Sequence, residues 1–130
     1  MTRYYKLKAR HLRLGRRGED IACNLLRAKM VDVLLRNFKC SKGEIDIIAR
    51  DGAILCFVEV KTRRHSARYR PVSGLSSRQK DRIYRAAFTY LREIDQPVTP
   101  FRFDLIEVIF SRFDVKEIRH WPNHFTRANR

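Results

Sequence analysis

Residues 43–61 read GEIDIIARDGAILCFVEVK, two apolar runs separated by Asp51 and Gly52. Runs of this length that are rich in Ile and Val favour β-strands. Asp-Gly between two such runs is a strong signal for a two-residue hairpin turn. We therefore expect an antiparallel hairpin in which Arg50 pairs with Ala53.

The register of this hairpin decides which side chains share a face of the sheet. Counting outward from the turn places Asp46 opposite Phe57, and Glu44 opposite Glu59. Because side chains alternate along a strand, one face should carry Glu44, Asp46, Ile48, Leu55, Phe57, Glu59 and Lys61. The other face is entirely apolar and is expected to be core: Ile45, Ile47, Ala49, Ile54, Cys56, Val58 and Val60.

Three carboxylates, Glu44, Asp46 and Glu59, crowd the first of these faces. Two like charges about 4 Å apart repel by roughly 4 kcal/mol at an effective dielectric constant of about 20, so these groups must be protonated, ion-paired or bound to a cation. Carboxylate oxygens without nearby Cys or His favour a hard cation such as Mg²⁺. Lys61 could orient a water or stabilise developing charge. The pattern fits metal-dependent phosphodiester hydrolysis, although Glu and Lys alternate on many solvated strands too.

Upstream of the hairpin the sequence predicts a basic arm followed by a helix. Residues 1–13, MTRYYKLKARHLR, have no sustained helical period and are interpreted as the arm. From Gly15 to Lys29 apolar residues recur at spacings of three and four, which indicates an amphipathic helix. Glu19 shares its apolar face, so it is either paired, protonated or bound to a cation there, or it lies in the first turn and favours the helix dipole. The sequence leaves both interpretations open.

Downstream of the hairpin, residues 62–74 are expected to form a long basic loop. They have no hydrophobic period, and Pro71 and Gly74 break regular structure. We expect the arginines of this loop to contact phosphates without reading bases: Arg63, Arg64, Arg68 and Arg70.

The remaining runs complete the order of elements. Ser76 and Gln79 match a capping box, which begins a helix that ends before Pro97. Strands are expected at Val31–Cys40 and Phe101–Phe110, with a short edge strand at 115–121. The order is helix, three strands, helix, then one or two strands, an α/β fold with a mixed sheet flanked by helices. We expect one domain over residues 14–125, with the arm at 1–13 and a tail at 126–130.

The composition limits the class of partner. The 130 residues include 29 Lys and Arg against 14 Asp and Glu, a net charge of +15, so a polyanion is the expected partner. No apolar run approaches the ~18 residues that a membrane-spanning helix needs, and the first residues lack the apolar core of a secretion signal. The three cysteines suit neither a disulfide framework nor a zinc site, so reduced thiols and a cytoplasmic location are expected.

Three polar residues near the C-terminus receive plainer interpretations. His120 and His124 flank Pro122 without an evident third ligand, so no zinc site is expected. Asp104 could support the acidic site through a cationic partner, but an ordinary surface ion pair is the favoured interpretation.

Four segments resemble a known family: GRRGEDIACNLL, RNFKCSKGEIDIIARDG, LCFVEVKTR and FRFDLIEV. They look like the bacterial YraN-type family of predicted endonucleases, similar to archaeal Holliday junction resolvases and to restriction enzymes of the PD-(D/E)xK superfamily. The resemblance covers about residues 14–125. Its most specific part is GEID at 43–46 followed by FVEVK at 57–61.

The resemblance implies a restriction-endonuclease-like core and a set of roles for named residues. The metal ligands for Mg²⁺ or Mn²⁺ in the catalytic site would be Asp46, Glu59 and Glu19. Lys61 would be the catalytic lysine. Gln79 and Lys80 would occupy a polar position on the second helix, and Lys80 would also contact nucleic acid. The implied partners are DNA, including branched DNA, and a second copy of the chain; no small-molecule cofactor is implied. Met30 stands where relatives usually have Gly.

Two hypotheses from different classes follow. The first is a metal-dependent endonuclease acting on DNA. The second is a non-catalytic module for DNA or RNA that keeps a nuclease fold. Charge does not separate them, whereas the intact set of Asp46, Glu59 and Lys61 favours the first.

Overall fold

The computed structural model describes residues 3–65, 74–95, 99–112 and 114–126, with side chains described from residue 13 onward. It contains two helices and five strands in the order α-β-β-β-α-β-β. Their bounds are α1 Arg3–Ala28, β1 Asp32–Cys40, β2 Gly43–Asp51, β3 Ile54–Arg64, α2 Ser77–Glu93, β4 Phe101–Phe110 and β5 Val115–Phe125. The predicted α/β fold and element order are confirmed.

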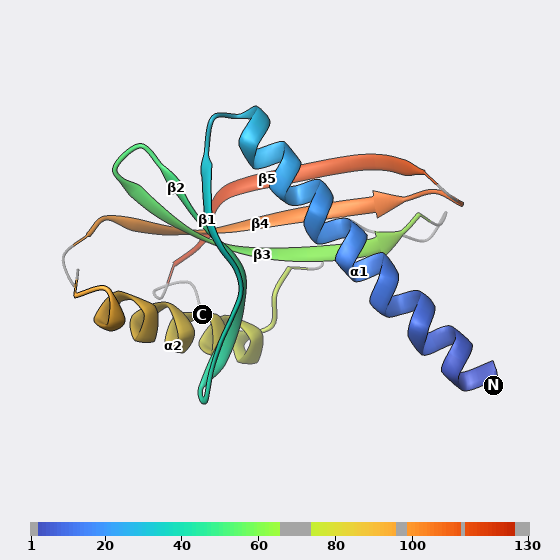
Figure 1. Ribbon diagram of the computed structural model, residues 1–130, viewed down its shortest axis with the longest axis horizontal. Helices are drawn as coiled ribbons and strands as arrows, with labels where there is room; N and C mark the ends of the chain where they lie inside the picture. The colour runs from blue at the N-terminus through green and yellow to red at the C-terminus, as the bar shows by residue number, and fades with distance from the viewer. Residues whose placement is uncertain (1–2, 66–73, 96–98, 113, 127–130) are drawn as a thin grey trace.

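The strands form one mixed sheet in the order β1-β2-β3-β4-β5 (Figure 1). β3 and β4 run parallel, and the other neighbouring pairs are antiparallel. A parallel pair needs a crossover connection, and the segment containing α2 provides it. No helix in the described part of the chain is long and apolar enough to cross a membrane.

The two helices cover opposite faces of the sheet (Figure 1). Under α1 lies a core that includes Leu26, Ile47 and Val58. Under α2 lies a second core that includes Ile48, Phe57 and Tyr84. The prediction that one hairpin face is core is therefore incomplete, since α2 buries the apolar part of the other face as well.

The first helix begins at Arg3 and not near Gly15. The expectation that residues 1–13 lack helical structure is wrong for residues 3–13, because Arg, Lys and Leu are good helix formers and no Pro interrupts them. Leu14 packs beside the core under α1, and the Arg17 guanidinium lies 5.0 Å from the centre of the Phe110 ring. The turns before this contact extend beyond the sheet (Figure 1).

The central hairpin turns one residue later than the Asp-Gly pair suggests. Asp51 pairs with Ile54, and Gly52 occupies the first turn position with a φ of 61°. This is the turn geometry that has Gly at its first central position. The predicted pairing of Arg50 with Ala53 is wrong, because Arg50 pairs with Leu55. A register change of two residues keeps the alternation of faces, so Glu59 and Lys61 stay on their predicted face, whereas Ile45 packs with Ile48 and Phe57 under α2 and not with Ile47.

The start of α2 agrees with the prediction from the sequence, and the end of β5 does not. The capping box at the start of α2 is confirmed: the Ser76 hydroxyl accepts from the Gln79 N–H at 3.1 Å, and the Gln79 side chain accepts from the Ser76 N–H at 3.0 Å. β5, in contrast, continues past Pro122 to Phe125. Proline is tolerated there because β5 is an edge strand and its pairing with β4 is irregular at this point.

Candidate active site

Asp46 and Glu59 form a direct carboxyl pair between β2 and β3. Ile47 pairs with Val58, and Asp46 and Glu59 are the next residues along β2 and β3. Their side chains share a hydrogen bond. The Val60 N–H donates a second hydrogen bond to Asp46 Oδ2 at 2.8 Å. The structure thus places the two carboxyls closer together than the diagonal arrangement expected from the sequence.

Both carboxyls are difficult to ionise together. Burial, and then the charge of Asp46, raise the pKa of Glu59 to about 8. Burial also raises the pKa of Asp46, although the hydrogen bonds from Val60 and Glu59 oppose the shift. In the absence of a cation, Glu59 therefore keeps its proton to a higher pH than an ordinary carboxyl, as closely spaced carboxyl groups do elsewhere.

Lys61 lies beside this pair, with Nζ 3.8 Å from Glu59 Oε1. Its side chain is 25% exposed and that of Glu59 is 18% exposed, so both can be reached from solvent. Between β3 and α2 they border a small polar cavity of about 200 Å³. Its lining residues are Glu44, Glu59, Lys61, Gln79, Arg82 and Ile83. Asp46, Glu59 and Lys61 thus lie together, as predicted.

Glu19 approaches the pair from α1. Burial, and then the charge of Asp46, raise the pKa of Glu19, which places the two carboxyls within electrostatic reach of each other. Arg36 Nη2 lies 3.7 Å from Glu19 Oε2 and 2.8 Å from Asp20 Oδ1. The Asn37 side chain hydrogen-bonds to Glu19. Of the two interpretations left open by the sequence, the structure supports the partnered one, because α1 begins well before Glu19.

Glycine allows the second helix to approach the acidic strand closely. A Cβ added at Gly43 would overlap the backbone carbonyl of Arg82 on α2. Since backbone cannot rotate out of the way, only glycine permits this contact between β2 and α2. Glu44 follows Gly43 directly, and Asp46 lies two residues further on. The contact therefore fixes the end of β2 that carries the acidic residues.

The donor set fits a hard divalent cation through two carboxylates. In the described part of the chain, no group of three or more His, Cys, Asp or Glu side chains is arranged to hold a metal ion. Mg²⁺ usually takes only one or two protein carboxylates and completes its shell with water and phosphate. A cation bound between Asp46 and Glu59 would offset the negative charge of Asp46 that makes Glu59 difficult to ionise.

The residues predicted to contact nucleic acid differ in their surroundings. Arg63 Nε lies 3.8 Å from Glu107 Oε2. Arg64 is exposed at the end of β3. Lys80 lies with Nζ 5.7 Å from the centre of the Phe125 ring. Arg68 and Arg70 lie outside the described residues.

Glu107 is a neighbour of the site that sequence reasoning missed. It is paired with Lys61 in the β3–β4 register, so both side chains lie on the face covered by α2. Its side chain is only 1% exposed. The signal available in the sequence was its charge in FRFDLIEVIF, a largely apolar strand that also contains Arg102 and Asp104.

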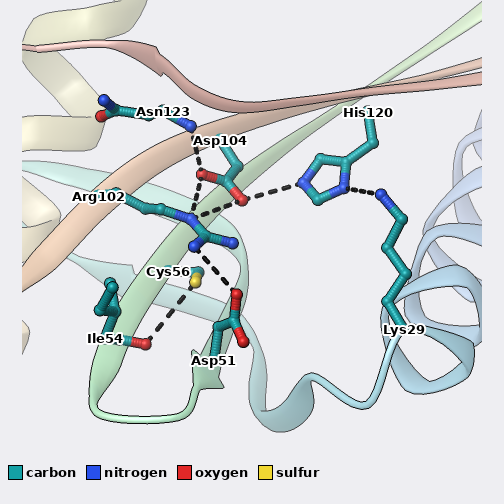
Figure 2. A network of polar contacts seen from close by, with 8 residues as sticks. All are labelled: Lys29, Asp51, Ile54, Cys56, Arg102, Asp104, His120 and Asn123. Atoms are coloured by element: carbon teal, nitrogen blue, oxygen red, sulfur yellow. Dashed lines mark hydrogen bonds and ion pairs between the residues drawn. The ribbon is translucent and has the colours of Figure 1, made fainter.

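A second buried carboxyl, Asp104, belongs to a separate network on the opposite face (Figure 2). Arg102 Nε donates to Asp104 at 3.0 Å, His120 Nε2 lies 3.0 Å away, and the Asn123 N–H donates at 2.9 Å. Lys29 Nζ in turn lies 2.7 Å from His120 Nδ1. Asp104 is fully buried, so the favoured interpretation of a surface ion pair is wrong.

The chain resembles the members of one protein family over most of its length. The model of that family, described as "Uncharacterised protein family UPF0102", matches residues 18–108. A UPF0102 protein of Chlorobaculum parvum is 42% identical over 115 residues, 88% of this chain and 89% of the relative. Relatives from Geotalea uraniireducens and Clostridium kluyveri are 39% and 42% identical, cover 88% and 82% of this chain, and are themselves covered over 91% and 88%.

Proposed function

The chain belongs to the uncharacterised protein family UPF0102, and from this premise we propose that it binds DNA and hydrolyses phosphodiester bonds with a divalent metal ion. The observation that supports this most is the Asp46–Glu59 pair, two hydrogen-bonded carboxyls in a protein of net charge +15. Crowded carboxylates would only repel phosphate on a surface that merely binds nucleic acid. They become useful when a cation lies between them and phosphate.

In this proposal Asp46 and Glu59 hold Mg²⁺ or Mn²⁺, and Glu19 adds negative charge from α1. The ion would polarise a phosphoryl oxygen and lower the pKa of a water beside it. Carboxylate oxygens are the ligands that such hard cations prefer.

Lys61 is the residue proposed to act on the reacting groups. Its ammonium lies 3.8 Å from Glu59 and borders the polar cavity. There it can hold the attacking water or neutralise charge that develops on a phosphate oxygen. A cavity of about 200 Å³ is suited to a phosphate group and not to a base pair. The proposal therefore predicts contacts to the backbone of DNA and little sequence preference.

Branched DNA and a homodimer belong to the same proposal. Symmetrical cleavage of two strands needs two active sites related by a two-fold axis, which a dimer provides. Sedimentation of the protein alone and with a four-way junction tests this part. A single copy bound to each cleaved junction would contradict it.

Cleavage of a panel of DNA structures tests the chemistry. Linear, flapped and four-way DNA are incubated with Mg²⁺ or Mn²⁺ and the parent, Asp46→Asn, Glu59→Gln or Lys61→Ala. We expect each variant to lose at least about 100-fold in cleavage rate, the scale set by removing one charge-stabilising group. Asp32→Asn, which changes an exposed carboxylate, is the matched control and should cleave like the parent. Cleavage that persists undiminished in all three variants would show that the site is elsewhere.

DNA binding should respond in the opposite way. Because the carboxyls repel phosphate, Asp46→Asn and Glu59→Gln should bind DNA as tightly as the parent or more tightly. Binding is measured by fluorescence anisotropy at several salt concentrations without divalent ions. A large loss of binding in a folded Glu59→Gln would contradict the proposal. Salt-dependent binding without cleavage under any condition would favour the alternative, a non-catalytic nucleic-acid-binding module.

A further inference from the structure

Asn37 has an unusual backbone in the middle of a strand. Its φ is 54°, in the left-handed region that side chains other than Gly rarely adopt. The strand around it is paired regularly, since Arg36 pairs with Ile47 and Phe38 with Ile45. Asn37 therefore lies across from Asp46 and is not part of a turn. Asn is one of the few residues that tolerate this conformation.

The conformation changes which side of the sheet Asn37 can reach. In a regular strand, neighbouring side chains point to opposite faces. Here Arg36 and Asn37 both contact acidic residues of α1: Arg36 lies 2.8 Å from Asp20, and Asn37 hydrogen-bonds to Glu19. The left-handed residue breaks the alternation and allows two successive side chains to engage the same helix.

We propose that Asn37 is a positioning residue, which uses its left-handed backbone to hold the Glu19 carboxylate beside Asp46. The inference rests on the proposed function, in which Glu19 adds negative charge to the Asp46–Glu59 pair. An amide orients a carboxylate without cancelling its charge, so Glu19 keeps its attraction for a cation. Arg36 would not replace it, because its guanidinium lies nearer to Asp20 than to Glu19.

The test uses Asn37→Gly as its main variant. Glycine accepts the left-handed backbone without strain, so the variant should fold, and it lacks the amide. Its thermal unfolding temperature should not fall below that of the parent. Asn24→Ala, on the exposed part of α1, is the matched control. Glu19→Gln alone and combined with Asn37→Gly complete the set.

The first measurement needs no metal ion. The side-chain amide of Asn37 gives its own pair of signals in a ¹H–¹⁵N spectrum of the full chain. If the amide donates to Glu19, these signals should move in Glu19→Gln, while those of Asn24 stay in place. Unmoved Asn37 signals would overturn the inference.

The second measurement is the affinity for Mn²⁺ by calorimetry. We expect Asn37→Gly to weaken Mn²⁺ binding about tenfold, the scale at which partners that orient metal ligands act. Asn37→Gly should have no further effect in the Glu19→Gln background, because it acts through Glu19. A parent that binds no Mn²⁺ would overturn the proposed function. A parent that binds Mn²⁺ through Asp46, with equal affinity in Asn37→Gly, would overturn this inference alone.

Discussion

The protein buries carboxyl groups in two places, and their surroundings are opposite. On the face covered by α1, Asp104 receives hydrogen bonds from Arg102 and the Asn123 N–H and lies 3.0 Å from His120 Nε2 (Figure 2). Across the sheet, Asp46 and Glu59 have each other, the Val60 N–H and the Lys61 ammonium 3.8 Å from Glu59. The first carboxyl is surrounded by donors, and the second pair is crowded by like charge.

The difference appears directly in their protonation. Burial opposes ionisation of Asp104, but the hydrogen bonds from His120, Asn123 and Arg102 outweigh it and lower its pKa. Burial raises the pKa of Asp46, and burial and then the charge of Asp46 raise the pKa of Glu59. A fully compensated carboxylate holds a fold together, whereas an uncompensated pair is a place where a cation or proton can bind. The comparison therefore separates an acid that is compensated within the fold from the acidic pair that we propose to be functional.

The largest expected effect is the loss of stability in Asp104→Ala. Removing one partner of a buried ionic network leaves the others uncompensated and costs about 3–5 kcal/mol of unfolding free energy. Asp46→Ala should leave the unfolding free energy unchanged or higher, because it removes a source of repulsion. Urea denaturation of both variants measures the difference. Equal destabilisation by the two substitutions would contradict the proposed difference between Asp104 and the Asp46–Glu59 pair.

The next effect concerns the backbone that supports the acidic pair. Gly43→Ala forces a Cβ against the Arg82 carbonyl and should cost about 1–3 kcal/mol, the range for overpacking a filled interior. Gly15→Ala is the matched control, because a Cβ there meets nothing within 4 Å. As a helix-interior glycine, it should gain about 0.5–1 kcal/mol when replaced. A Gly43→Ala protein as stable as Gly15→Ala would contradict the close contact between β2 and α2.

The pH dependence of stability should differ in sign between the two centres. The lowered pKa of Asp104 gives stability that is present above an ordinary Asp pKa of about 3.9 and is lost as the pH falls below it. The raised pKa of Glu59 gives stability that is present below about 4.3 and is lost as the pH rises toward about 8.

The unfolding free energy of the metal-free protein, measured across this pH range, gives the pH dependence due to Asp104 and that due to Glu59. Asp104→Asn should remove only the loss of unfolding free energy at acid pH. Glu59→Gln should remove only the loss between about pH 4.3 and 8. A parent whose stability does not change over the upper range would contradict the raised pKa of Glu59.

The smallest effect lies outside both centres, at the end of α1. Met30 has a φ of 65° and lies two residues past the end of α1. A left-handed backbone costs a residue with a side chain roughly 1–2 kcal/mol relative to Gly, so Met30→Gly should be about 1 kcal/mol more stable. Thermal unfolding measures the gain, and Mn²⁺ affinity should not change. No gain in stability would show that the Met30 side chain offsets its backbone strain.

The sequence predicted the structure best where the prediction rests on a pattern that spans only a few residues. The faces of Glu59 and Lys61 follow from alternation along a strand, and they hold even though the turn lies at Gly52-Ala53. An error of two residues in register is harmless to such an argument, while an error of one residue would have reversed it. The capping box at Ser76 is similarly local, and it is present as predicted.

The sequence was least informative where partners come from distant strands. Asp104 receives its donors from Arg102, His120 and Asn123, and the last two belong to an edge strand whose irregular pairing no local pattern predicts. The left-handed backbone of Asn37 is equally hidden, because Asn is also common in ordinary loops. The helical state of residues 3–13 was missed because charge repulsion and a weak apolar period pointed away from it.

The placement of the Asp104 donors also orders events during synthesis of the chain. His120 and Asn123 belong to β5, which leaves the ribosome after every other element described. Until then, Asp104 has Arg102 but lacks its other two contacts, and the face under α1 contains a carboxylate that favours water over burial. The nascent sheet should therefore stay open on this side, and its closure should be a late step that follows the arrival of β5.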